Sequence, residues 1–352
     1  MGRAGKRFMC AAVVGACLLG STIAGWGADV PSFAVTNTIN VGGVGGWDYV
    51  TVSADGQRLY APRGTNMQVI DLANKKVIAT IPGTKRGHGC VLVPSAGRGF
   101  ITFGGDGSVV VFDLDSNKVL GTLKTEADAD GIFFDTATQK VILVSGDGNS
   151  VWRIDPGIDL QTGKPEGPLA LGGAPESFAL DGQGKAFINL ADKAQIAVVD
   201  LNAWKVLDHW SVSPAKTPVG MAYDPKTKRL FSSCRSGQMM VLNAENGMII
   251  GELPIGPGVD ASVFDGKYAF ASCADGTLAV VGEKSPGEYA VLQTVKTGVG
   301  ARTMTLDPRT DTIYLVTADV DPKSPTVGAN GKPVRPKFLP NTFKVLVVSQ
   351  VR

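Results

Sequence analysis

Short runs of alternating apolar and polar residues recur along most of the chain, separated by glycine, asparagine and aspartate. Residues 58–61, 67–70 and 77–81 show this alternation in consecutive segments. A period of two is typical of β-strands, and small polar residues are typical of the tight turns between them. No segment after residue 27 keeps the period of a helix, so the pattern predicts an all-β fold.

A short glycine-led motif, here called the lead-in, precedes the first strand of each unit. Its first copy is Gly46-Trp47-Asp48-Tyr49-Val50, and its central residue recurs six more times, at intervals of 40, 42, 46, 43, 41 and 42 residues. Such a period is typical of four-stranded propeller blades. The sequence therefore predicts a seven-bladed β-propeller. The central residues of the lead-ins are Asp48, His88, Asp130, Glu176, Val219, Asp260 and Arg302.

Each end of the repeat region carries one additional strand. Residues 33–39 alternate like a strand but precede the first lead-in, and residues 343–348 form a strand at the other end. Closed propellers commonly complete one blade with strands from both chain ends, which leaves no exposed sheet edge. We therefore expect a single propeller domain over residues 28–352, with residues 33–39 as the outer strand of the last blade.

One long insertion, residues 319–341, interrupts blade seven. It is rich in proline and glycine, and the repeat alignment places it between the second and third strands. Loops at that point are expected on the same face as the lead-ins. Because loops of this length are usually functional or disordered, two interpretations are open: a lid over the channel mouth, or a surface loop.

The first 27 residues differ in composition from the rest. Three basic residues precede an apolar stretch over residues 8–19, and mostly small residues follow. This order predicts a secretory signal peptide over residues 1–27, cut between Ala24 and Ala28, and hence a periplasmic or secreted protein. A lipoprotein anchored at Cys17 and an uncleaved membrane anchor are the two other interpretations.

Charge and missing motifs narrow the function classes. The whole chain has 34 Lys and Arg against 32 Asp and Glu; without the three basic residues of the predicted signal peptide the balance is 31 to 32, or −1. A near-neutral chain argues against a broad nucleic-acid surface. The sequence lacks the haem, zinc-finger, nucleotide and serine-hydrolase motifs. Cys234 and Cys273 occupy equivalent blade positions, too far apart for a disulfide, and are expected to be free thiols.

Several short motifs recur within the repeats. They include Arg58-Leu59-Tyr60, Val69-Ile70-Asp71-Leu72, residues 75–81, residues 218–224 and residues 300–307. With these motifs and the proline-rich insertion, nearly all of the chain after residue 27 resembles the YVTN-repeat propellers, in particular the bacterial YncE-like group. The resemblance implies an exported seven-bladed protein without assigned chemistry, and it raises single-stranded DNA binding as one alternative.

The lead-ins supply the candidate binding site. In a closed ring their central residues share one channel, and with a neutral histidine they would carry a charge of −3, which favours a cation or an amine. Merely solvated side chains in a wet channel are the alternative. The candidate ligand-binding residues are Trp47, Asp48, His88, Asp130, Glu176, Asp260 and Arg302.

No motif requires a cofactor, but a divalent metal is one candidate ligand of this ring. Mixed imidazole and carboxylate ligation suits several divalent ions. The candidate metal ligands are a subset of Asp48, His88, Asp130, Glu176 and Asp260.

The sequence thus predicts a monomeric binding or scaffold protein without a membrane span in its mature chain. Its partner would be a small molecule or metal ion in the channel, or a protein on the lead-in face. An alternative is a channel-centred lyase or hydrolase, in which His88 acts as acid or base and Arg302 holds an anionic group. Trp47 would stack on a ligand at the channel mouth or, alternatively, pack between blades.

Overall fold

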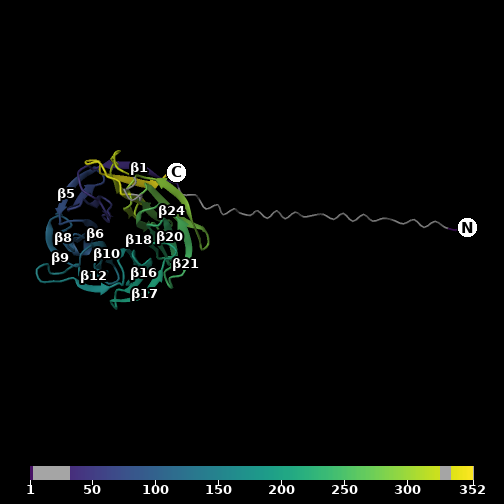
Figure 1. Cartoon of the computed structure of the whole chain (residues 1–352), viewed down its shortest axis with the longest axis horizontal. Coiled ribbons are helices and arrows are strands. Elements are labelled where there is room, and N and C mark those ends of the chain that lie inside the picture. Colours follow the sequence, from purple (N-terminus) through teal and green to yellow (C-terminus); the bar gives the residue numbers. More distant parts are fainter. Residues whose placement is uncertain (3–31, 326–333, 352) are drawn as a thin grey trace.

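The computed structural model describes residues 1–2, 32–325 and 334–351. Their strands form seven four-stranded antiparallel sheets, which Figure 1 shows as blades around a central axis. The predicted seven-bladed β-propeller is therefore confirmed. Apart from Met1 and Gly2, the predicted signal peptide, with Cys17, lies outside the described residues, as does the middle of the insertion in blade seven.

Blades one to six are meanders in which consecutive strands pair. Blades one and two contain β2 (Thr51–Val52), β3 (Arg58–Pro62), β4 (Asn66–Asp71), β5 (Lys76–Pro82), β6 (Gly87–Val93), the short 3₁₀ helix η1 (Pro94–Ala96), β7 (Arg98–Phe103), β8 (Ser108–Asp113) and β9 (Val119–Lys124). Blades three and four contain β10 (Ala129–Asp135), β11 (Lys140–Ser145), β12 (Ser150–Ile154), β13 (Glu166–Ala170), β14 (Pro175–Leu180), β15 (Lys185–Leu190), β16 (Gln195–Asp200) and β17 (Lys205–Ser211). Blades five and six contain β18 (Pro218–Asp224), β19 (Arg229–Cys234), β20 (Gln238–Asn243), β21 (Ile249–Pro254), β22 (Val259–Phe264), β23 (Ala269–Cys273), β24 (Thr277–Ser285) and β25 (Glu288–Lys296).

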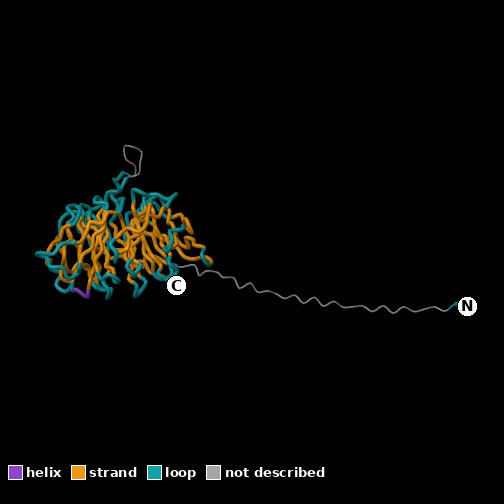
Figure 2. The backbone as a smooth tube through the Cα atoms, turned by 90° about the horizontal axis from the view of Figure 1, so that it is seen from below, coloured by secondary structure: helices purple, strands orange, loops and turns teal. Residues whose placement is uncertain are grey.

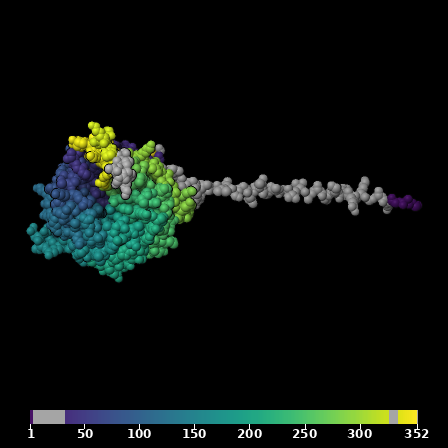
Figure 3. Space-filling model, viewed as in Figure 1, coloured from purple at the N-terminus to yellow at the C-terminus, as the bar shows by residue number. Residues whose placement is uncertain are grey.

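Blade seven is built from both ends of the chain. In spatial order from the outside, its strands are β1 (Phe33–Asn40), β28 (Lys344–Gln350), β27 (Thr312–Thr317) and β26 (Met304–Asp307). β1 pairs antiparallel with β28, from Phe33 opposite Gln350 to Asn40 opposite Lys344. In Figure 3 the yellow C-terminal residues accordingly lie beside the purple residues of blade one. The predicted closure of the ring is confirmed.

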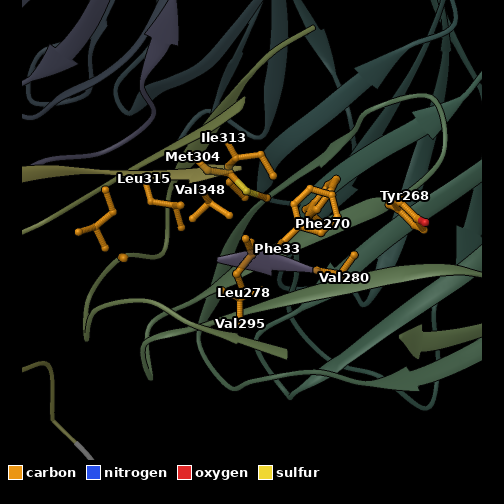
Figure 4. Packing of buried hydrophobic residues seen from close by; sticks show 13 residues of the cluster. Phe33, Tyr268, Phe270, Leu278, Val280, Val295, Met304, Ile313, Leu315 and Val348 are labelled. Atoms are coloured by element: carbon orange, nitrogen blue, oxygen red, sulfur yellow. The ribbon is translucent and has the colours of Figure 1, made fainter. Parts of the chain in front are cut away.

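The hydrophobic core is divided among the contacts between neighbouring blades. One cluster joins blades one and two through side chains such as Tyr60 and Phe103, and another joins blades seven and one through Leu59 and Val345. Figure 4 shows the cluster between blades six and seven, where Phe33 of β1 enters the core. Because each blade has an apolar residue set on both faces, it is buried only when both neighbours are present.

The described ends of the insertion lie on the lead-in face. The insertion joins β27 to β28, as predicted, and Val320 forms a bridge with Phe338 across its base. The Phe338 ring packs edge-on against Trp47, with centroids 4.7 Å apart. Figure 2 shows the ring from the side, with loops covering both ends of the strands.

Cys90, Cys234 and Cys273 are buried free thiols, as expected for the latter two. Burial raises the pKa of both Cys234 and Cys273 to about 12, so these thiols are unreactive at neutral pH. Within the described part of the chain, no helix has the length and apolar character needed to cross a membrane.

Closure of the ring by β1 can be tested by removing the Phe33 side chain. Phe33 is 3% exposed and packs edge-on against Phe270, with centroids 5.1 Å apart. We expect Phe33→Ala to lower the free energy of unfolding by about 3–5 kcal/mol because it leaves a core cavity. Thr36→Ala, at an exposed position of the same strand, should change it by less than about 0.5 kcal/mol. Denaturant unfolding measures both, and deletion of β1 with an unchanged melting temperature would refute its closing role.

Candidate functional site

The lead-ins enter the innermost strands through a tight turn. Two positions before the central residue, the backbone is left-handed in at least five of the seven copies. These residues are Arg86 (φ 57°), Asp128 (60°), Thr217 (56°), Gly258 (70°) and Gly300 (81°). Glycine adopts this conformation without strain and aspartate tolerates it, which suits Gly258, Gly300 and Asp128 at this position.

The central residues of blades two to six also lie in β-bulges. In β10 the pairing register shifts between Ala129 and Ile132, on either side of Asp130. A bulge breaks the alternation of side-chain directions and re-aims the affected side chain. The side chains at these positions are thereby released from the regular alternation that packs blade against blade. Equivalent register shifts surround His88, Glu176, Val219 and Asp260.

Hydroxyl groups fix the backbone of these lead-ins to the neighbouring blade. Because these hydroxyl groups are buried or nearly so, their hydrogen bonds are stronger than hydrogen bonds exposed to water. The site residues are therefore held by backbone contacts as well as by their own side chains. Thr102 Oγ1 donates to the carbonyl of Asp130 (2.6 Å), Ser272 Oγ to that of Arg302 (2.5 Å) and Thr303 Oγ1 to that of Asp48 (2.9 Å).

Four side chains from blades one to three form the aspartate–histidine cluster, consisting of Asp48, His88, Asp128 and Asp130. His88 Nδ1 lies 2.8 Å from Asp48 Oδ2 and 3.4 Å from Asp130 Oδ1, and its Nε2 lies 3.6 Å from Asp128 Oδ1. The ligand atoms of Asp48, His88 and Asp130 all lie within 4.8 Å of one another. Three of the sequence-predicted site residues are thus brought together.

Two glycines make room for this cluster. A methyl group on Gly104 would lie 2.6 Å from His88 Nε2 and 2.8 Å from Asp128 Oδ1, and one on Gly146 would lie 2.5 Å from Asp128 Oδ2. Such distances are far below van der Waals contact. Gly104 and Gly146 directly follow the second strands of blades two and three, so this blade position must lack a side chain where the cluster forms.

The cluster strongly perturbs proton binding. Burial by itself lowers the pKa of His88, but the hydrogen bond to Asp48 and the charges of Asp130 and Asp128 outweigh it and raise the pKa to about 9. Burial raises the pKa of Asp130 well above its usual value, with His88 opposing and the neighbouring carboxylates adding to this effect. At neutral pH the imidazole is therefore charged. It supplies the positive charge of the cluster together with Arg86, whose Nη2 lies 2.7 Å from Asp128 Oδ1.

The other side of the ring is an arginine–carboxylate cluster of Glu176, Arg235, Asp260 and Arg302. Arg235 lies 2.6 Å from Asp260 Oδ1 and 3.4 Å from Glu176 Oε1, and Arg302 Nε lies 3.0 Å from Asp260 Oδ2. Burial raises the pKa of Glu176 to about 7 although Arg235 opposes the shift. Burial likewise raises the pKa of Asp260 against both arginines.

The structure therefore divides the predicted ring into two parts. Glu176 and Asp260 pair with Arg235, and Arg302 pairs with Asp260, so these residues do not join His88. Trp47 faces neither cluster: its indole nitrogen donates to the carbonyl of Gly300 (3.3 Å) and its ring packs against Phe338 and Phe343, as in the inter-blade interpretation. The arginine–carboxylate cluster balances two carboxylates with two arginines. The acidic excess therefore belongs to the aspartate–histidine cluster, which has three carboxylates against His88 and the adjoining Arg86.

Sequence reasoning missed Arg235, which follows the second strand of blade five. A comparison of the repeats nevertheless contains a signal for Arg235. The residue at this position is glycine or alanine in five blades, and arginine in blades one and five: Arg63, Gly104, Gly146, Ala191, Arg235, Ala274 and Ala318. Where most blades have glycine or alanine, a long basic residue indicates a side chain that reaches into the channel or makes a contact specific to its blade.

Asp128 and Tyr49 were also missed. Asp128 precedes the central residue of its lead-in by two positions, and its left-handed backbone hides it from an alignment of strands. Tyr49 is near carboxylates of both clusters: burial and then the charges of Asp130, Asp260, Glu176 and Asp48 raise its pKa well above the usual value. Its phenol therefore stays protonated at neutral pH.

The fold and the ring define the class: a seven-bladed β-propeller with two charged clusters at the lead-in end of its central axis. Comparison with protein-family models and with the sequences of curated proteins gives no match. The function is therefore argued from the site itself.

The raised pKa values predict that stability falls as the pH rises. The raised pKa of Glu176 adds to the free energy of unfolding below pH 4.5, its unfolded pKa, and this contribution is lost as the pH rises past about 7. The raised pKa of His88 adds to it below about pH 6.5, and this contribution is lost as the pH rises past about 9. We expect each loss to be on the order of 2–3 kcal/mol in metal-free protein.

Two neutral variants separate these contributions. Glu176→Gln should flatten the decline between pH 5 and 7, and His88→Gln that between pH 7 and 9, in urea unfolding at each pH. An unchanged decline above pH 7 in His88→Gln would show that the imidazole is not held charged by its neighbours.

Proposed function

We propose that the protein is a binding protein whose ligand is a small cation, most specifically a divalent metal ion, held by Asp48, His88 and Asp130. The observation that carries the proposal is the convergence of their ligand atoms within 4.8 Å. Two ligands about 2.1 Å from a metal, at tetrahedral or octahedral angles, lie roughly 3.0–3.4 Å apart. The 2.8 and 3.4 Å separations from His88 Nδ1 are close to this spacing.

Two carboxylates of the cluster support a bound cation. Asp130 is 8% exposed, and its Oδ1 has no hydrogen-bond partner among the described residues. Asp128 Oδ1 is paired with Arg86 Nη2 at 2.7 Å and faces His88 Nε2 at 3.6 Å. A carboxylate in this position can orient an imidazole whose other nitrogen binds a metal. A metal ion at this site would displace the proton that His88 carries without it. One nitrogen and two carboxylate ligands then suit several divalent transition metals and leave coordination positions open for water or a further ligand.

Metal binding can be tested by calorimetric titration with Zn²⁺ and Mn²⁺. Asp130→Asn should weaken binding by about 100-fold or more, because it removes one of three ligands, and Asp128→Asn by about 10- to 100-fold, because it only orients His88. Asp147→Asn serves as the matched control, since Asp147 is an exposed turn aspartate in the same blade. Absence of binding, or equal affinities for all four proteins, would refute the proposal.

We further infer that the chain is an exported member of the YncE-like YVTN-repeat group. The support is the basic, apolar and small-residue order of the first 27 residues, together with the recurring motifs of the repeats. Mass spectrometry of the exported protein should give a mature N-terminus just after one of residues 24–28. A lipid-modified N-terminus at Cys17 would indicate a lipoprotein, and a full-length cytosolic chain would refute export.

A further inference from the structure

Arg63 is a buried arginine without a carboxylate partner among the described residues. It follows the second strand of blade one, is 3% exposed, and its Nε and Nη1 are enclosed without a hydrogen-bond partner among the described residues. Burial is the one cause that lowers its pKa, to about 10, and no acidic group offsets it. An isolated charge taken out of water is strongly unfavourable unless an opposite charge compensates it.

The equivalent residue of blade five shows how the charge of a buried arginine is usually compensated. Arg235 has two carboxylates within 3.4 Å, and their charges raise its pKa although burial opposes them. Arg63 instead lies over the ring of Phe343, with its guanidinium carbon 3.6 Å from the centroid. Stacking on an aromatic ring holds the guanidinium plane but leaves its edge donors free.

Further unpaired polar groups lie on the same side of this hairpin. Asn66 Oδ1 and Gln68 Oε1 are buried without partners among the described residues. Both residues follow the turn after Arg63 and alternate along β4, so they share a face. The oxygen and nitrogen of an amide are interchangeable by rotation. Arg63 lies opposite Asn66, its N–H donating to the Asn66 carbonyl (2.7 Å). Rotating these amides would therefore present NH₂ donors on the face of the hairpin that carries Arg63.

The glycine loop of residues 42–46 lies against the Arg63 backbone and the Gln68 side chain; a methyl group on Gly43 would lie 3.8 Å from Gln68 Nε2. Gly45 approaches so closely that a methyl group there would lie 2.7 Å from the Arg63 carbonyl oxygen, and residues 43–46 are exposed on their other side. Gly42, Gly43 and Gly45 have positive φ angles. A glycine loop of this kind lets backbone N–H groups approach an anion.

We propose that Arg63, with the glycine loop of residues 42–46 and the amides of Asn66 and Gln68, binds an oxyanion, either a carboxylate or a phosphate. The guanidinium edge matches two oxygens of such a group. The site borders the channel mouth, because Gly64 accepts a hydrogen bond from Gly87 of the second lead-in (2.8 Å) and lies beside Gly46 of the first. It is independent of the metal ion proposed above.

The test compares melting temperatures in chloride, acetate and inorganic phosphate at equal ionic strength. Phosphate or acetate at ten times its dissociation constant should raise the melting temperature of the wild type by about 2 °C relative to chloride. A gain in phosphate alone assigns a phosphate site, and a gain in acetate alone assigns a carboxylate site. Calorimetric titration with the same anion should show one binding site.

Three variants decide whether Arg63 carries the effect. Arg63→Met should lose the anion-dependent gain and melt no lower than the wild type in chloride, because it removes an uncompensated charge. Arg63→Lys should keep at most a small gain, since an ammonium group lacks the paired donors. Arg98→Met is the control, because Arg98 Nη1 donates hydrogen bonds to the carbonyls of Pro156 and Ile158. Its loss should lower the melting temperature in every buffer and leave the anion-dependent gain unchanged.

Two outcomes would overturn the proposal. One is the same anion-dependent gain in Arg63→Met and the wild type. The other is no gain for the wild type in either anion, with Arg63→Met less stable in all three buffers, which would make Arg63 a purely structural partner of Phe343.

Discussion

Everything in this molecule depends on closure of the ring by the pairing of β1 with β28. Each blade has apolar residues on both faces, so its core is complete only between two neighbours. The last of these contacts forms only when Phe33, near the start of the described chain, packs against blade six and its strand joins the C-terminal strand. The same closure brings Asp48 of the first lead-in beside Thr303 of the last.

The site shows how a rigid ring can hold charges that would otherwise repel one another. Carboxylates converge near the axis, and burial opposes the ionisation of Asp130, Glu176 and Asp260. His88 on one side and Arg235 with Arg302 on the other offset much of this repulsion. A cation site requires closely spaced ligands whose negative charge is only partly compensated. The packing between blades offsets the unfavourable free energy of burying these charges.

Much of the fold and part of the site could be predicted, for different reasons. The repeat length of about 42 residues is a local property of strand and turn lengths, so it revealed the blade count and the inward position of Asp48, His88 and Asp130. The division of the ring could not be predicted, because it depends on how far Arg235 reaches across to Glu176 and Asp260. Asp128 was missed because a left-handed turn, rather than strand alternation, directs it.

By itself, the sequence determined the all-β architecture, the number of blades and the residue types at the channel mouth, because periodicity and turn chemistry act over a few neighbouring residues. Only the tertiary structure decided which of these side chains meet. Ring closure and bulge geometry set the distances between atoms about 40 residues apart, and charge interactions depend on those distances. Trp47 illustrates the difference: the sequence left open whether it stacks on a ligand or packs between blades, and in the structure its ring packs against Phe338 and Phe343.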